Sequence, residues 1–66
     1  MNLGENIKLA RKAAGLTQTE LGEKIGVSQR EISRWEINKI VPNVLIFAEI
    51  CKALNASSDE ILELKR

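Results

Sequence analysis

Hydrophobic residues recur every three or four positions along the 66-residue chain, which is the spacing of amphipathic helices. One such stripe predicts a first helix that Asn2 caps and Gly15 ends. Another predicts a fourth helix that Asn43 caps and Asn55 ends. Both stripes are expected to face a shared core, in which a single cysteine packs as a small hydrophobe rather than as a ligand or redox group. Their apolar positions are Leu3, Ile7, Ala10, Ala14, Val44, Phe47, Ile50, Cys51 and Leu54.

Capping boxes mark three further helix starts, each with a Ser or Thr followed three residues later by Glu. The pairs are Thr17 with Glu20, Ser28 with Glu31, and Ser57 with Glu60. They predict helices over about 18–25 and 29–35, and a short fifth helix that ends near Leu64. Gly26 suits the left-handed turn between the first two of these helices. We therefore expect an all-α fold of five helices, in one domain that spans residues 1–66.

The segment 17–36 has the organisation of a helix-turn-helix. Its apolar residues face the rest of the domain, and long hydrogen-bond donors remain on the outer face of its second helix. Such a helix enters the major groove of DNA, where Arg can bind guanine and Gln can bind adenine through two hydrogen bonds each. The apolar residues are Leu21, Ile25, Val27, Ile32 and Trp35. The residues expected to contact bases are Gln29, Arg30, Ser33 and Arg34.

Other polar residues flank this reading face. Gln18 stands at the positive N-terminus of the first motif helix, where a phosphate is readily bound. Ser28 is expected to cap its helix with its backbone near a phosphate, and Glu31 is expected to cap rather than to accept a hydrogen bond from cytosine. Asn38 and Lys39 follow the second helix and are further phosphate candidates, although a solvated surface charge is nearly as good an account of Lys39.

Taken together, these residues resemble the lambda-repressor/Cro-like helix-turn-helix domains, also called the XRE family. The resemblance covers nearly all of the chain. It implies that Arg11 forms an ion pair with Glu36 and that Gln18 contacts the DNA backbone. The residues that carry it are Arg11, Thr17, Gln18, Gly26, Val27, Ile32, Trp35, Glu36, Pro42 and the run Asp59–Leu62.

Two positions depart from the family pattern. Gly22 replaces a preferred Ala and is expected to weaken its helix by about 1 kcal/mol. Asn38 replaces a preferred Gly, a mild change because Asn tolerates positive φ better than other side chains.

A homodimer on a palindromic operator is expected, because one short helix discriminates too little against a genome of competing sites. In relatives the fifth helix and the turn before it usually pair across the two-fold axis. The resemblance therefore implies an interface that contains Ser58, Ile61, Leu62 and Leu64, to which Leu45 or Ile46 contribute.

Composition narrows the function classes without deciding between them. One Cys and no His exclude an internal disulfide framework and a zinc-finger ligand set. No catalytic constellation is present, so we expect neither an enzyme nor a bound cofactor. Residues 1–39 carry seven Lys or Arg against five Glu, whereas residues 40–66 carry three against four acidic residues. A cytoplasmic repressor fits these features, although activator and repressor are not distinguished by sequence.

Several aliphatic residues lie outside the core stripes, where relatives are commonly polar. They either fold over one another as a small loop core or form a contact surface for a partner protein. The second account favours an alternative function, in which the chain is the antitoxin of a toxin–antitoxin pair and its DNA binding is autoregulatory. The residues concerned are Ile37, Ile40, Val41, Leu45 and Ile46.

Overall fold

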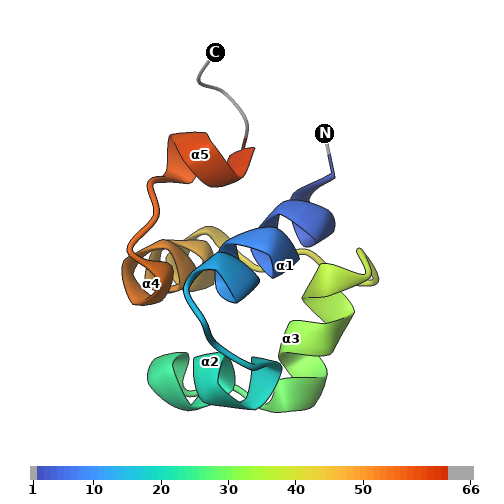
Figure 1. Cartoon of the computed structure of the whole chain (residues 1–66). Coiled ribbons are helices and arrows are strands. Elements are labelled where there is room, and N and C mark those ends of the chain that lie inside the picture. The colour runs from blue at the N-terminus through green and yellow to red at the C-terminus, as the bar shows by residue number, and fades with distance from the viewer. Residues whose placement is uncertain (1, 63–66) are drawn as a thin grey trace.

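The structure is a computed structural model that describes residues 2–62 of the chain. Five α-helices and no strand are present in these residues, as the sequence predicts. Figure 1 shows α1 and α4 across the middle of the molecule, α2 and α3 on one side of them, and α5 on the opposite side. The helices are α1 Leu3–Ala13, α2 Gln18–Ile25, α3 Gln29–Glu36, α4 Val44–Leu54 and α5 Ser58–Leu62.

Side-chain caps start the helices close to where the sequence predicts them. The oxygens of Asn2, Thr17, Ser28 and Asn43 each accept a hydrogen bond from the backbone N–H three residues later. At Thr17 and at Ser57 the Glu also accepts from the N-cap amide, so both capping boxes are complete. At Ser28 the box is half formed, because within residues 2–62 the Glu31 carboxylate does not accept from the Ser28 amide. The expectation that Glu31 acts as a cap is therefore wrong in this structure.

Left-handed residues end the helices and redirect the chain. Gly15 follows α1 with a φ of 76°, and Gly26 ends α2 with a φ of 77°. Asn55 ends α4 with a φ of 53°. The amides of Ala14 and Leu16 both donate to the carbonyl of Arg11 at 3.2 Å, and these bonds close the end of α1. The sharp turn at Gly26 brings α3 against α2 and forms the predicted helix-turn-helix.

The core lies where α1, α2, α3 and α4 meet, and α5 covers its open end. The buried apolar residues are Ile7, Leu21, Ile32, Trp35, Ile50, Leu54 and Ile61. The side-chain amide of Asn6 donates to the carbonyl of Ile61 at 2.7 Å and so fixes α5 against α1. The aliphatic core that the composition indicates is therefore present, with Trp35 as its aromatic member.

The apolar face of α4 is rotated relative to the predicted stripe. Val44 is 78% exposed, whereas Ile46 packs against the core. Ile46, Ile50 and Leu54 follow one another at four-residue intervals, and this row packs in the core while Phe47 and Cys51 flank it. The predictions that Val44 belongs to the core stripe and that Ile46 lies outside it are therefore wrong. Ala14 is also exposed, because α1 ends before it.

Gly22 permits a close approach between the motif helices. A Cβ atom at this position would lie 2.5 Å from the carbonyl oxygen of Val27, which is closer than a carbon atom can approach without a shift of the backbone. The expected loss of about 1 kcal/mol of helix propensity is therefore offset by contact that a side chain would prevent. Gly22 is a packing requirement of this chain rather than a weakness of α2.

Candidate nucleic-acid interface

The outer face of α3 carries the side chains that the sequence predicts to contact bases. Gln29, Arg30 and Arg34 are exposed and Ser33 is half-buried, whereas Ile32 and Trp35 point into the core. Figure 1 places α3 at a corner of the molecule, beside α2. The structure thus leaves two guanidinium groups and one amide on a single accessible helix face.

Beneath this face, Arg11 and Glu36 form the ion pair that the family resemblance implies. Nε of Arg11 lies 2.6 Å from Oε2 of Glu36, and Nη2 lies 3.1 Å from Oε1. Nη1 donates to the carbonyl of Leu16 at 2.7 Å. The Arg11 side chain is 9% exposed and the Glu36 side chain 2%. Because both charges are buried, the pair fixes α1 against the end of α3 more than it adds net stability.

Gln18 joins this ion pair to the first residue of the reading helix. Its Nε2 donates to Oε1 of Glu36 at 2.9 Å, and its Oε1 accepts from Nε2 of Gln29 at 2.5 Å. One N–H of the Gln18 amide remains for a phosphate, together with the backbone amides of the first turn of α2. Sequence reasoning found the position of Gln18 at the helix start but missed that its side chain also bridges α2 and α3.

Asn38 has a second role that the sequence did not reveal. Its φ is 62°, so the left-handed conformation expected from the family's Gly is present. Its Oδ1 accepts from the amide of Gly4 at 3.0 Å, and its Nδ2 donates to Oδ1 of Asn2 at 2.8 Å. These bonds join the loop after α3 to the first turn of α1. The backbone amide of Asn38 donates to the carbonyl of Trp35 at 3.0 Å, so one N–H of its side-chain amide is the donor that remains for a phosphate.

The two other phosphate candidates are accessible. Lys39 is exposed, and its amide donates to the carbonyl of Arg34 at 2.8 Å, which closes the end of α3. Ser28 is exposed, and its hydroxyl accepts from the amide of Glu31 at 3.2 Å. Its capping role is confirmed, and its backbone amide remains the phosphate candidate that the sequence predicts.

The dimer candidates on α5 differ in what they expose. Ser58 is exposed and Leu62 is half-buried, so both have surface to offer a second protomer. Ile61 is 2% exposed and belongs to the core of its own chain, which removes it from the surface available to a partner. Leu64 lies outside the described residues.

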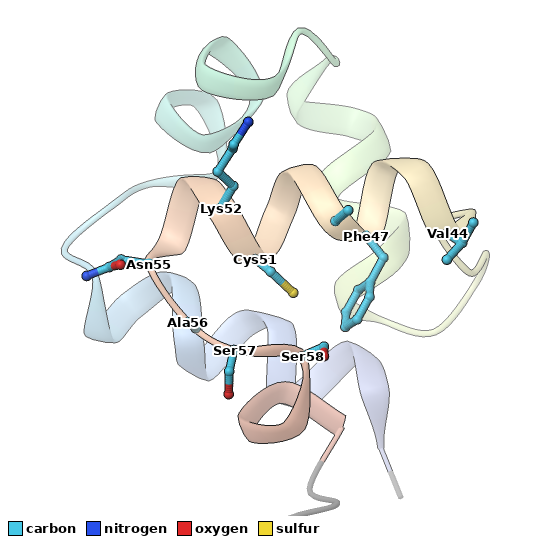
Figure 2. A pocket seen from close by; sticks show the side chains of 9 residues that line it. Val44, Phe47, Cys51, Lys52, Asn55, Ala56, Ser57 and Ser58 are labelled. Atoms are coloured by element: carbon cyan, nitrogen blue, oxygen red, sulfur yellow. The ribbon is translucent and has the colours of Figure 1, made fainter.

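The aliphatic residues between α3 and α4 form an exposed apolar surface instead of a small loop core. Ile37 is 66% exposed, Val41 74%, Leu45 76% and Ile40 37%. A groove of about 670 Å³, which Val44 helps to line, lies between α4 and the start of α5 (Figure 2). Phe47 and Cys51 point into the groove, and partial burial raises the pKa of the Cys51 thiol above its ordinary value.

The motif residues, their spacing and their fold all match known helix-turn-helix proteins. The family described as helix-turn-helix matches residues 7–61 of the chain. The chain belongs to this helix-turn-helix family. It is 38% identical over 61 residues to repressor protein C2 of Salmonella phage P22, which covers 92% of this chain and 28% of that protein. It is 36% identical over 67 residues to antitoxin HipB of Escherichia coli K12, which covers 86% of this chain and 76% of that protein.

Solved structures have the same fold. The P22 c2 repressor in complex with a synthetic operator superposes with a TM-score of 0.84 at 36% identity, over 92% of each chain. The clp gene regulator ClgR of C. glutamicum superposes with a TM-score of 0.88 at 31% identity, over 94% of this chain and 80% of that chain. The chain spans less than a third of the curated P22 repressor it matches. None of the helices in residues 2–62 has the length and apolar character needed to cross a membrane.

Proposed function

We propose that this chain is a sequence-specific transcriptional regulator that binds double-stranded DNA with α3 in the major groove. The observation that carries the proposal is the exposed donor face of α3, held from beneath by the buried pair of Arg11 and Glu36. The similarity to a repressor solved in complex with a synthetic operator supports DNA binding by this fold. In this reading, bases are contacted by Gln29, Arg30, Ser33 and Arg34.

Affinity for any DNA sequence comes from groups that flank α3. These are Lys39, the backbone amide of Ser28, and one remaining side-chain N–H each on Gln18 and Asn38. Phosphate contacts of this kind set register and carry little sequence information, whereas base contacts carry most of it. Variants of the base-contacting residues should therefore lose affinity mainly for the operator. Variants of the phosphate-contacting groups should lose affinity for operator and random duplexes alike.

The regulator acts as a homodimer, because a single α3 reads too few base pairs for useful discrimination. Ser58 and Leu62 on α5 supply the surface for the two-fold contact, and Leu45 at the start of α4 contributes to it. Two-fold pairing places the recognition helices about 34 Å apart, one turn of the duplex. The regulator is a repressor in the cytoplasm, where its operator lies.

Selection of bound sequences from random DNA tests this function. Recovery of a palindromic site whose half-sites lie about ten base pairs apart supports it. Fluorescence anisotropy on the selected duplex and on a scrambled duplex then measures the specificity ratio across a salt series. Equal affinity for both duplexes at every salt concentration would contradict sequence-specific regulation.

A second function has its own supporting observation, the exposed apolar surface formed by Ile37, Ile40, Val41 and Leu45. Such a surface suits a protein partner, and the similarity to antitoxin HipB favours a toxin as that partner. The test is coexpression with the product of the neighbouring gene, followed by purification of a complex. Val41→Lys should abolish that complex and leave DNA binding intact if the surface is the toxin contact.

A further inference from the structure

Four side chains form one hydrogen-bonded chain that runs from the core to the reading face. Arg11 donates to Glu36, Glu36 accepts from Gln18, and Gln18 accepts from Gln29. The chain crosses from α1 through the end of α3 and the start of α2 to the start of α3. It therefore connects a buried charge to an exposed amide on the surface that meets DNA.

The direction of every hydrogen bond in this chain follows from the charge at one end. A carboxylate accepts hydrogen bonds and donates none, so Gln18 must turn its NH₂ group toward Glu36. Its oxygen then faces Gln29, and an oxygen also only accepts. Gln29 must therefore present its NH₂ group to Gln18.

This direction determines what Gln29 offers to a base. One N–H and both lone pairs of Oε1 are left on the amide of Gln29. An adjacent acceptor and donor form the pattern that the major-groove edge of adenine complements through N7 and the N6 amino group. With the chain reversed, Oε1 would be occupied and two N–H groups would face outward, which suits the two acceptors of guanine.

We propose that Glu36 is a positioning residue for base specificity, and that its carboxylate sets the adenine preference of Gln29 through Gln18. The proposal rests on the DNA-reading function proposed above. Glu36 touches no base itself, because its side chain is 2% exposed. It acts by permitting one of the two orientations of the Gln18 and Gln29 amides and excluding the other.

Gln18→Met removes the side chain that joins Glu36 to Gln29 and leaves both residues of the Arg11–Glu36 pair in place. The base pair that faces Gln29 is identified first, as the operator position at which Gln29→Ala removes the sequence preference. The probes are the selected operator and three duplexes that carry the other base pairs at this position. Gln18→Met should lower the preference for adenine about fivefold or more, the size of one two-bond base contact. A general loss of phosphate affinity would lower binding to all four duplexes by the same factor.

Glu36→Gln tests the direction of the hydrogen bonds from residue 36 to Gln29, because an amide at position 36 can donate as well as accept. It should reduce the adenine preference and move it toward guanine, whereas Glu23→Gln removes an exposed carboxylate as a matched control and should leave the preference unchanged. In the Gln18→Met background, Glu36→Gln should have no further effect on the preference. If Glu36→Gln does not give a native circular dichroism spectrum, the wild-type preference at the same site decides, because a preference for guanine over adenine would overturn the orientation that Glu36 is proposed to set.

An equal loss on all four duplexes for Gln18→Met would overturn the positioning role and leave the proposed function standing. Lack of any sequence preference in the wild-type chain would overturn both. A selective loss of adenine preference in Gln18→Met, together with a shift toward guanine in Glu36→Gln and no change in Glu23→Gln, would establish the positioning role of Glu36.

Discussion

The side chain of Asn38 accepts a hydrogen bond from the amide of Gly4 at 3.0 Å, across 34 residues of sequence. The contact holds the loop that follows the reading helix against the first turn of α1. It depends on two backbone features, the φ of 62° at Asn38 and the lack of a side chain at Gly4. A Cβ at Gly4 would lie 2.7 Å from the carbonyl oxygen of Glu36, so the start of α1 and the end of α3 could not approach as closely.

Variants at Asn38 should separate the hydrogen bonds from the backbone conformation. Asn38→Gly keeps the left-handed φ and loses both side-chain bonds, so we expect a loss of about 1 kcal/mol in the free energy of unfolding. Asn38→Ala also places a Cβ in the left-handed region and should cost about 1–2 kcal/mol more. Urea denaturation followed by circular dichroism measures both. Equal stability of the two variants would mean that the backbone is not held at positive φ.

Gly22→Ala should destabilise the protein although Ala is the better helix former. The new Cβ would lie 2.5 Å from the carbonyl of Val27, and relief of this clash should cost about 1–3 kcal/mol. Glu23→Ala, at the next and exposed position of α2, serves as the control and should be nearly neutral. Thermal denaturation compares the two variants with the wild-type chain. A Gly22→Ala variant as stable as Glu23→Ala would contradict the close approach of α2 and α3.

Local signals were enough to predict the helices, whereas contacts between distant residues were not visible in the sequence. Caps such as Thr17 and turns such as Gly26 depend on neighbouring residues, and these predictions are confirmed. The face that α4 turns to the core depends on how neighbouring helices pack against it. For this reason the sequence pattern predicts Val44 in the core and Ile46 on the surface, whereas the structure shows the reverse. The same reason explains Ile61, whose burial depends on α1 and α4 rather than on its own helix.

In the candidate site, too, some contacts were predictable from the sequence and others required the folded structure. The ion pair of Arg11 and Glu36 followed from the family resemblance and is confirmed by their geometry. The engagement of Gln18 with Glu36 and Gln29 required the folded arrangement of α2 and α3, because amide partners have no sequence signature at this spacing. The hydrogen bonds from Asn38 to Gly4 and Asn2 had one local signal, because Asn stands at a position where the family prefers Gly.

A charge on α5 should separate dimerisation from folding. Ser58 is the first residue of α5, where a Glu is favoured by the helix dipole, so Ser58→Glu should fold normally. In a two-fold interface it would bring two like charges together. Sedimentation velocity with operator in molar excess should then show one protomer per bound duplex, whereas the wild-type chain should still load two. Ala13→Glu, at an exposed position on α1, is the matched control and should still bind as two protomers.

Cys51 should react slowly with alkylating reagents in the folded protein. Partial burial raises the pKa of its thiol, so a smaller fraction is thiolate at pH 8 than in the unfolded chain. The reaction with iodoacetamide should therefore be slower in buffer than in urea, and the difference should narrow as the pH rises above the raised pKa. Mass spectrometry of timed samples measures the rate, and equal rates at pH 8 would contradict the burial of this thiol.

Arg34 and Lys39 should differ in how their loss affects DNA binding, because one lies on the reading face and the other in the loop behind it. Arg34→Ala should cost about 1–3 kcal/mol per half-site on the operator and little on a scrambled duplex. Lys39→Ala should weaken both duplexes by similar factors and lower the slope of log K against log salt by about one per contact. Fluorescence anisotropy across a salt series gives both quantities, with Lys8→Ala on α1 as a matched loss of one positive charge away from the motif. If Arg34→Ala weakens both duplexes by the same factor, Arg34 is a phosphate contact, and base reading rests on Gln29, Arg30 and Ser33.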